Sequence, residues 1–260
     1  FILSLAVIFS MQSRSLAGQG IELLRHNQVE RGVEYLERAV GYNPFRADYR
    51  MTLSQVYAAV GENDKAMKQA VRAVELSTHD IRTRDNLISV ALTTGNNAEA
   101  AAAAATLIFL APHERSNYEN VAEIYGRLGL SELQAGNVET AREYFTECTL
   151  VPEKLLEHEE SLSELSRQMW SGTKLEVTRK MHLHAGQAWY WLGDFTQARS
   201  SLRGAAKSDA LKEEASLYLA LLRDKQGREQ DAQEYLAQAI EINPGIEEKF
   251  QELRQLPVLD

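Results

Sequence analysis

One short spacing recurs along this chain and limits the folds open to it. A glycine is followed five residues later by an alanine at Gly61/Ala66, Gly95/Ala100, Gly136/Ala141, Gly193/Ala198 and Gly227/Ala232. Successive glycines of this series are 34, 41, 57 and 34 residues apart. A period of about 20–50 residues is typical of solenoids, in which each repeat buries its apolar face against its neighbours. The chain is therefore predicted to be an array of repeats.

The best-formed copy is the stretch Tyr125–Pro152. It reads as two amphipathic helices joined by a turn at Gly136-Asn137, and Pro152 is expected to end the second helix. Two such helices pack closely only where their facing residues are small. Small residues stand at the expected crossing points: Gly129, Ala141 and Cys148. The single cysteine is therefore expected to be a buried, inert thiol.

This pattern resembles the tetratricopeptide repeat family. The resemblance rests on the pair Leu128-Gly129, the turn glycine, the alanine five residues later, the aromatic Phe145 and the closing proline. It extends over about residues 13–244, with one interruption. It implies an all-α, right-handed superhelical solenoid of about six helix hairpins with a concave groove. It also implies that the chain binds protein segments and is not an enzyme.

Placed on this period, the chain divides into five segments. They are an apolar N-terminal segment (1–12), repeats 1–4 (13–152), an irregular helical insert (153–178), repeats 5–6 (179–244), and a capping helix with a tail (245–260). A terminal helix with one polar face is what a solenoid needs, and the last few residues are expected to be loose.

Two irregular spacings predict the departures from the repeat. Seven extra residues before the fourth repeat predict one long helix over Ser116–Ala135. A further 23 extra residues follow Pro152, and they predict a helix over Leu156–Met169, a loop at Trp170–Thr173 and a long helix from Lys174. This insert either caps the front half or extends the stack as an irregular pair, and we favour the second because the repeat resumes in register.

Composition excludes several classes of function. One cysteine excludes an internal disulfide framework and a cysteine-based zinc site built from this chain alone. A net charge of −9 argues against general nucleic-acid binding, because phosphate contacts need a basic face. The acidic excess lies in residues 113–260, since residues 1–112 hold 11 Lys/Arg and 11 Asp/Glu.

No catalytic, cofactor-binding or metal-binding constellation is recognisable in the sequence. His182 and His184 lie two residues apart on a predicted helix, so their imidazoles point to different faces. The sequence His158-Glu159-Glu160 lacks the second histidine that a zincin motif needs. Neither a P-loop nor a G-x-S-x-G motif occurs. We therefore expect a non-enzymatic protein without a cofactor or a metal.

The expected binding surface is a concave groove lined by the first helix of each pair, as the family resemblance implies. Its candidate residues are Arg14, Arg25, Gln55, Arg82, Asn86, Gln187, Tyr190 and Trp191. Further groove positions are Ala17, Ile21, Asp48, Met51, Ala59, Asp85, Ser89, Lys180 and Leu183. Arg25 and Arg82 are expected to bind a partner's carboxylate through charge-assisted hydrogen bonds. The lysine and asparagine set of the family's carboxylate clamp is incomplete, which argues against an adaptor for chaperone tails.

Three consecutive aromatic residues, Trp189, Tyr190 and Trp191, point to different sides of one predicted helix. At least one of them should face away from its own hairpin. Two interpretations are open. The aromatics either form an anchoring pocket for a partner, since such residues are enriched at binding hot spots, or pack against the insert helix near Trp170.

The segment Phe1–Phe9 is apolar apart from Ser4. Nine residues are too few to cross a bilayer, which needs about 20. The segment is expected to be either the end of a spanning helix or a helix extension packed on the first repeat. Arg14 and Arg25 follow it, which favours the cytoplasmic side by the positive-inside rule.

An apolar segment that runs directly into such repeats is similar in layout to the C-terminal tails of bacterial O-antigen ligase/polymerase-like membrane proteins. This layout implies a membrane-associated scaffold that binds a protein or peptide partner during cell-surface glycan assembly. The alternative is a free-standing soluble adaptor or assembly factor in the cytoplasm. Self-association of the array is compatible with both.

Overall fold

A computed structural model describes residues 2–170 and 174–259, without the side chains of residues 2–6, 167 and 170. Every regular element of these residues is an α-helix, which confirms the predicted all-α class. The chain falls into two units: unit 1 comprises residues 1–110 and unit 2 comprises residues 111–260.

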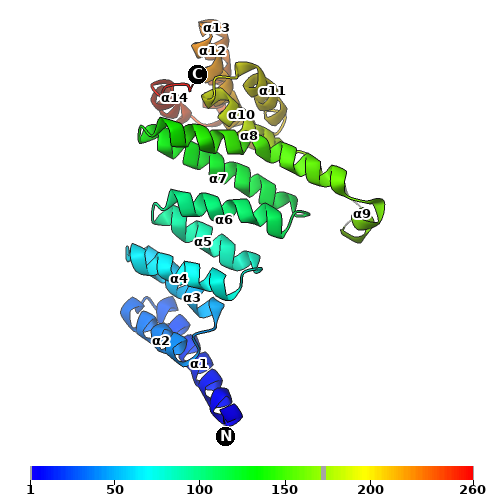
Figure 1. The fold of residues 1–260 in the computed structure, drawn as a ribbon. Helices are drawn as coiled ribbons and strands as arrows, with labels where there is room; N and C mark the ends of the chain where they lie inside the picture. Colours follow the sequence, from blue (N-terminus) through cyan, green and yellow to red (C-terminus); the bar gives the residue numbers. More distant parts are fainter. Residues whose placement is uncertain (1, 171–173, 260) are drawn as a thin grey trace. The chain divides into compact units, whose positions relative to one another are not determined.

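Unit 1 contains three helix hairpins (Figure 1). They are α1 (Ile2–Arg25) with α2 (Val29–Tyr42), α3 (Ala47–Ala59) with α4 (Asn63–Leu76), and α5 (Ile81–Thr93) with α6 (Asn97–Leu110). Helix α2 also packs on α3, and α5 packs on both α3 and α4. The first helices of the second and third hairpins, α3 and α5, are therefore direct neighbours.

Unit 2 also contains three hairpins (Figure 1). They are α7 (Arg115–Gln134) with α8 (Val138–Ser161), α10 (Arg179–Trp191) with α11 (Phe195–Ala205), and α12 (Asp209–Lys225) with α13 (Glu229–Ile242). Helix α14 (Ile246–Arg254) packs on α12 and α13 through Ile246, Phe250 and Leu253, at the place predicted for the capping helix. The long helix predicted before the fourth turn is confirmed to within one residue.

Each hairpin turn contains a residue in the left-handed backbone region. Five of these are the glycines of the repeating series, with φ between +70° and +82°. The sixth is Asn27, with φ of +58°, which lies 34 residues before Gly61. Asparagine is one of the few residues with a side chain that tolerates this conformation. The turn of the first repeat thus lies at the expected 34-residue spacing, with asparagine in place of glycine.

The prediction that Pro152 ends the second helix of the fourth hairpin is wrong. Helix α8 continues through the proline to Ser161, and its apolar stripe continues with it. Val151 and Leu155, on either side of Pro152, are both fully buried. The burial of these side chains offsets the backbone hydrogen bond that the proline removes. The boundary expected after residue 152 therefore falls inside a helix, and the division of the chain into two units falls between residues 110 and 111 instead.

The insert is shorter in helix than predicted. The helix predicted over Leu156–Met169 is divided between the end of α8, which runs to Ser161, and α9 (Glu164–Trp170), and residues 174–178 are not helical. The predicted loop at 170–173 lies largely outside the described residues. Leu175 N donates to the buried carboxylate of Glu159 (3.0 Å), which fastens this segment to α8. Thr178 then begins α10 by accepting a hydrogen bond from Met181 N (3.2 Å).

The insert does not extend the stack, contrary to the favoured prediction. Helix α10 packs directly on α7 and α8, so the fifth hairpin follows the fourth without an intervening pair. Among the described residues, no helix packs extensively on α9, which Figure 1 shows projecting from the hairpins of unit 2.

Leu259 is fastened to the hairpins of unit 2, whereas the tail Pro257–Asp260 was expected to be loose. Leu259 is 3% exposed. Its N–H donates to the carbonyl of Trp191 (2.7 Å), and its carbonyl accepts from Arg142 Nη1 (3.3 Å). One backbone–backbone hydrogen bond, one hydrogen bond from the Arg142 side chain and the buried Leu259 side chain thus hold this segment on α8 and α10.

Two other expectations concern single features of the core and of the N-terminus. Cys148 is fully buried against Ala122, and burial raises the pKa of its thiol to about 12, as expected of an inert thiol.

In α1, the apolar side chains of Val7, Ile8, Phe9 and Met11 are exposed. No helix of the described residues is both long enough and apolar enough to cross a membrane.

Candidate functional site: a charged cleft in unit 1

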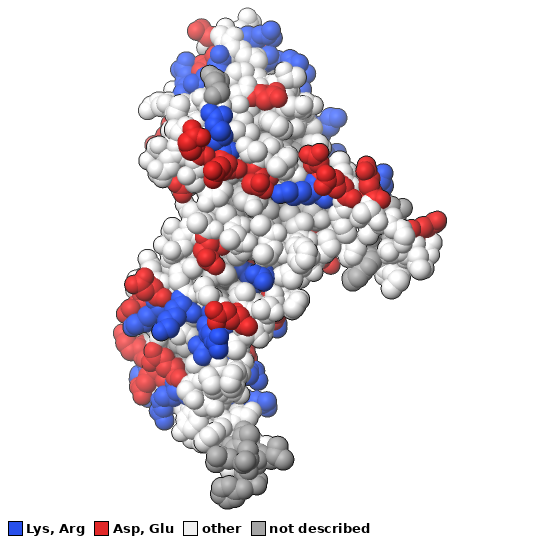
Figure 2. All heavy atoms as spheres, in the orientation of Figure 1, with Lys and Arg blue, Asp and Glu red and all other residues white. Residues whose placement is uncertain are grey.

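A cleft of about 600 Å³ opens in unit 1 where α3 and α5 begin. It is lined by Phe45, Arg46, Ala47, Asp48, Met51, Thr52, Gln55, Ser77, Asp80 and Arg82. The first helices of neighbouring hairpins supply most of this lining, which is the position predicted for a concave groove. Figure 2 shows Lys/Arg and Asp/Glu intermixed over α2–α4 on the face drawn, in place of a patch of one sign.

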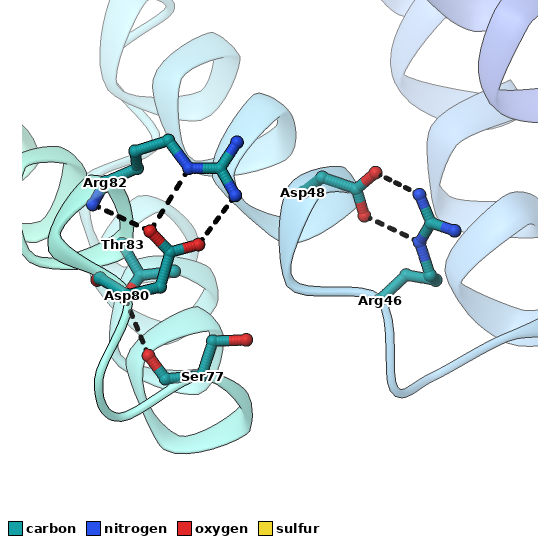
Figure 3. Close-up of polar contacts among 6 residues, drawn as sticks. All are labelled: Arg46, Asp48, Ser77, Asp80, Arg82 and Thr83. Atoms are coloured by element: carbon teal, nitrogen blue, oxygen red, sulfur yellow. Dashed lines mark hydrogen bonds and ion pairs between the residues drawn. The ribbon is translucent and has the colours of Figure 1, made fainter.

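The α3 side of the cleft carries a tight ion pair. Arg46 Nε donates to Asp48 Oδ1 (2.9 Å), and Arg46 Nη2 donates to Asp48 Oδ2, so the contact is bidentate (Figure 3). The hydrogen bonds from Arg46 hold the pKa of the Asp48 carboxyl below its ordinary value, although partial burial opposes this. Asp48 is therefore ionised throughout the neutral range.

The α5 side carries a second bidentate pair. Asp80 is the N-cap of α5, and its Oδ1 accepts from Arg82 N (3.0 Å) and Arg82 Nε (3.1 Å). Its Oδ2 accepts from Arg82 Nη2 (2.7 Å). Thr83 Oγ1 donates to the carbonyls of Ser77 (3.1 Å) and Asp80 (2.7 Å), which ties the loop to the helix. Hydrogen bonding from Arg82 lowers the pKa of Asp80, so this charge also persists at neutral pH.

The two pairs occupy equivalent positions of successive repeats with opposite signs. Arg46 and Asp80 are 34 residues apart, as are Asp48 and Arg82. One repeat thus reads Arg-Ala-Asp where the next reads Asp-Ile-Arg. Because of this inversion, the cleft carries two positive and two negative side chains in alternating positions.

The structure brings some of the predicted groove residues together. Gln55 and Arg82 both line the cleft and are exposed, and Asp48 and Met51 line it as well. Arg14 and Arg25 are exposed on α1 but outside the cleft, and Arg25 pairs with Glu22 of its own helix (3.2 Å).

Asn86 does not face the groove as predicted. It is 4% exposed, and its Nδ2 donates to the hydroxyl of Ser54 (2.9 Å). This buried hydrogen bond joins α5 to α3, because a buried amide needs a partner. Asn86 therefore fastens the two helices that form the cleft.

Sequence reasoning missed the other halves of the two ion pairs, Arg46 and Asp80. Both precede their helices, so they fall outside the helical positions searched for groove residues. The signal that could have found them is the inverted triplet at a distance of one repeat.

The predicted groove residues of unit 2 are buried. Tyr190 is fully buried and Trp191 is 1% exposed, so the prediction of an open aromatic pocket is wrong. Helix α10 packs on α7, α8 and α12: Trp191 stacks on Phe145 of α8, and Tyr190 meets Tyr218 of α12 edge-on. Trp189, which precedes them, is half-buried.

Gln187 of α10 is also buried. Its Oε1 contacts His184 Nδ1 (3.2 Å), and both side chains line a pocket of about 160 Å³ that Trp191 and Tyr218 help to close. This pocket is about a quarter of the volume of the unit 1 cleft. Across residues 2–170 and 174–259, no three His, Cys, Asp or Glu side chains are grouped as a metal site.

Unit 2 is expected to lose stability in mild acid because the pKa values of three of its histidines are lowered. Burial lowers the pKa of His158, His182 and His184 below 6.5, and His113, 3.1 Å from His158, adds to the shift of the latter. Their depressed pKa values mean that the unfolded chain binds protons first. The stability that they contribute is therefore present above about pH 6.5 and lost as the pH falls below it.

Thermal unfolding at pH 7.5 and 5.5 checks this expectation. Tryptophan fluorescence reports on unit 2, because all three tryptophans lie there. We expect a lower Tm at pH 5.5, and a smaller decrease for His184→Gln. Replacement of the exposed His79 of unit 1 by glutamine serves as the control. An undiminished decrease in His184→Gln would contradict the assignment to this residue.

Comparisons with known proteins identify the family and the fold. Residues 18–80, 86–149 and 190–245 match one family model, that of the tetratricopeptide repeat. PilF of Pseudomonas aeruginosa is similar in structure at 17% identity, with a TM-score of 0.50, over 95% of this chain and 98% of that one. PilW, a widely conserved type IV pilus biogenesis factor, is similar at 15% identity and TM-score 0.50, over 93% and 97% of the two chains. Such identities bear on the fold alone. No curated protein matches the sequence.

Proposed function

Because this chain belongs to the tetratricopeptide repeat family, we propose that it is a non-catalytic scaffold whose unit 1 cleft binds a segment of a partner protein. Proteins with such repeats are generally interaction scaffolds. The observation that supports this use of the cleft is its open, charged lining. The Arg82 side chain is 81% exposed although it is already paired with Asp80. A guanidinium has five N–H donors, so the pair leaves Arg82 able to donate to a further acceptor.

The variant Arg82→Glu tests this proposal. Dodecapeptides would be selected from a random phage-displayed library on the immobilised wild-type chain. Their dissociation constants would then be measured by fluorescence anisotropy. We expect Arg82→Glu to weaken the best peptide at least tenfold, because it reverses the most exposed charge of the cleft. Helical circular dichroism should not change, since an exposed ion pair contributes about 0–1 kcal/mol to stability.

Arg72→Glu is the matched control. Arg72 also belongs to an exposed ion pair of unit 1, with Glu75 (2.6 Å), but it lies on α4 and outside the cleft. Its dissociation constants should stay within about twofold of the wild type. Selected peptides that bind equally well to Arg82→Glu would exclude this cleft as the binding site.

We further propose that the chain is the tail of a bacterial membrane protein involved in cell-surface glycan assembly, on the cytoplasmic side. The apolar segment Phe1–Phe9 and the exposed Val7, Ile8 and Phe9 of α1 support this. A free-standing soluble adaptor is the alternative. The coding sequence upstream of Phe1 discriminates: further apolar spans are expected, whereas a start codon or signal peptide directly upstream would favour the adaptor. A free-standing adaptor is also expected to be monomeric without detergent.

A further inference from the structure

The two ion pairs of the unit 1 cleft differ in how much of each they present to a partner. The side chains of Arg82 and Asp48 are 81% and 54% exposed, whereas those of Arg46 and Asp80 are 40% and 28% exposed. Asp48 and Arg82, which occupy equivalent positions of the two repeats, are therefore the more exposed member of each ion pair. We call these two residues the outer column of the cleft. Figure 3 shows the Arg82 guanidinium extending in the direction of Asp48, whose carboxylate turns toward Arg46.

No ion pair joins Asp48 and Arg82 in this part of the described chain, because each carboxylate and guanidinium is held by its own neighbour two residues away. Each charged group is thereby held in place by its own neighbour and remains partly exposed. A bidentate pair still leaves donors on the arginine and lone pairs on the carboxylate. The Asp48 carboxylate of α3 and the Arg82 guanidinium of α5 can therefore each form a further contact with a partner.

From this arrangement we infer that the cleft recognises an extended segment carrying one acidic and one basic side chain three residues apart. The acidic side chain lies beside Arg82 and the basic side chain lies beside Asp48. This inference rests on the proposed function of the cleft and adds the chemistry of its partner.

The spacing follows from the packing of the helices. Helices α3 and α5 pack directly on each other, and the axes of packed helices lie about 8–10 Å apart. An extended chain advances about 3.1–3.4 Å per residue, so three residues span that distance. In the polyproline II conformation every third side chain also returns to the same face.

Uncharged polar groups in the cleft favour an extended partner over a helical one. Gln55 and Ser77 line the cleft, and no described residue forms a hydrogen bond with either side chain. They can bind the backbone N–H and C=O groups of a partner. An α-helix has already paired most of these groups internally, whereas an extended segment has not. Met51 and the exposed Phe45 provide apolar contact beside them.

Two charge exchanges test the inference while keeping the ion pair within each repeat. Arg46→Asp with Asp48→Arg makes the outer column wholly basic. Asp80→Arg with Arg82→Asp makes it wholly acidic. Both double variants keep the composition and net charge of the chain. The probes are four synthetic peptides of nine residues on an Ala/Pro background, with Lys and Glu three positions apart, two Glu, two Lys, or two Gln.

For the wild type we expect the Lys/Glu peptide to bind at least tenfold more tightly than the other three. The first exchange should shift the preference to the peptide with two Glu, and the second to the peptide with two Lys. Peptides selected from the random library should carry the same Lys/Glu spacing. Binding should weaken as salt is raised, because exposed charges are screened.

The outcomes separate this inference from the proposed function. If selected peptides depend on Arg82 but do not carry both signs, or if the exchanges leave the preference unchanged, the inference is wrong and the binding cleft stands. If no peptide responds to Arg82→Glu, the binding cleft itself is rejected. Should an exchange variant lose its helical circular dichroism, the single variants Asp48→Asn and Arg82→Gln replace it. Each should abolish the preference for one charge of the peptide, and an unchanged preference would overturn the inference.

Discussion

Trp191→Ala is expected to lower the free energy of unfolding of unit 2 by about 3–5 kcal/mol, as large aromatic-to-alanine changes in a core do. Trp191 is 1% exposed. Its ring stacks on Phe145 (centroids 6.2 Å apart) and meets Tyr218 edge-on (6.2 Å). Its backbone carbonyl also accepts the hydrogen bond from Leu259. Truncation leaves a cavity where α8, α10 and α12 meet.

Urea unfolding followed by the fluorescence of the remaining tryptophans measures this loss. The neighbouring Trp189→Ala is the control: this side chain is half-buried on the same helix, so a smaller loss is expected. A loss below about 1 kcal/mol for Trp191→Ala would show that the aromatic contacts do not hold the hairpins together. Binding of the selected peptides should persist in Trp191→Ala under native conditions, because the residues of the cleft all belong to unit 1.

Two glycines of α7 are expected to respond in opposite directions to alanine. A Cβ atom on Gly129 would lie 2.7 Å from two ring carbons of Phe145, far inside van der Waals contact. The Phe145 ring cannot move away freely, because Trp191 stacks on it. Gly129→Ala should therefore destabilise unit 2 by about 1–3 kcal/mol through overpacking.

Gly126, one helical turn earlier, provides the matched control. A Cβ atom there would meet only Cys148 Sγ, at an ordinary 3.9 Å. Gly126→Ala should stabilise unit 2 by roughly 0.5–1 kcal/mol, since glycine is a poor helix former. Urea unfolding of both variants decides the matter. Equal effects of the two substitutions would mean that helix propensity, and not the close approach to Phe145, controls this position.

The cleft shows how far a repeat pattern predicts a binding surface. Gln55 and Arg82 were found because groove positions recur at a fixed place on each first helix, and both line the cleft. Arg46 and Asp80 were not found, because they precede their helices and act only through contacts with a neighbour two residues on. Tyr190 and Trp191 were misassigned because the burial of a helix face depends on which hairpins flank it.

The sequence by itself determined the hairpins, their turns and the small residues at their crossings. These features are local: a left-handed turn residue and an apolar stripe act within one repeat of about 34 residues. Tertiary structure alone decided the rest. Helix α8 runs through Pro152 because its flanking side chains are buried, and Leu259 is held in place because its N–H donates to the carbonyl of Trp191 on α10. Such outcomes depend on contacts between distant segments, where the free energy of burial outweighs a local signal.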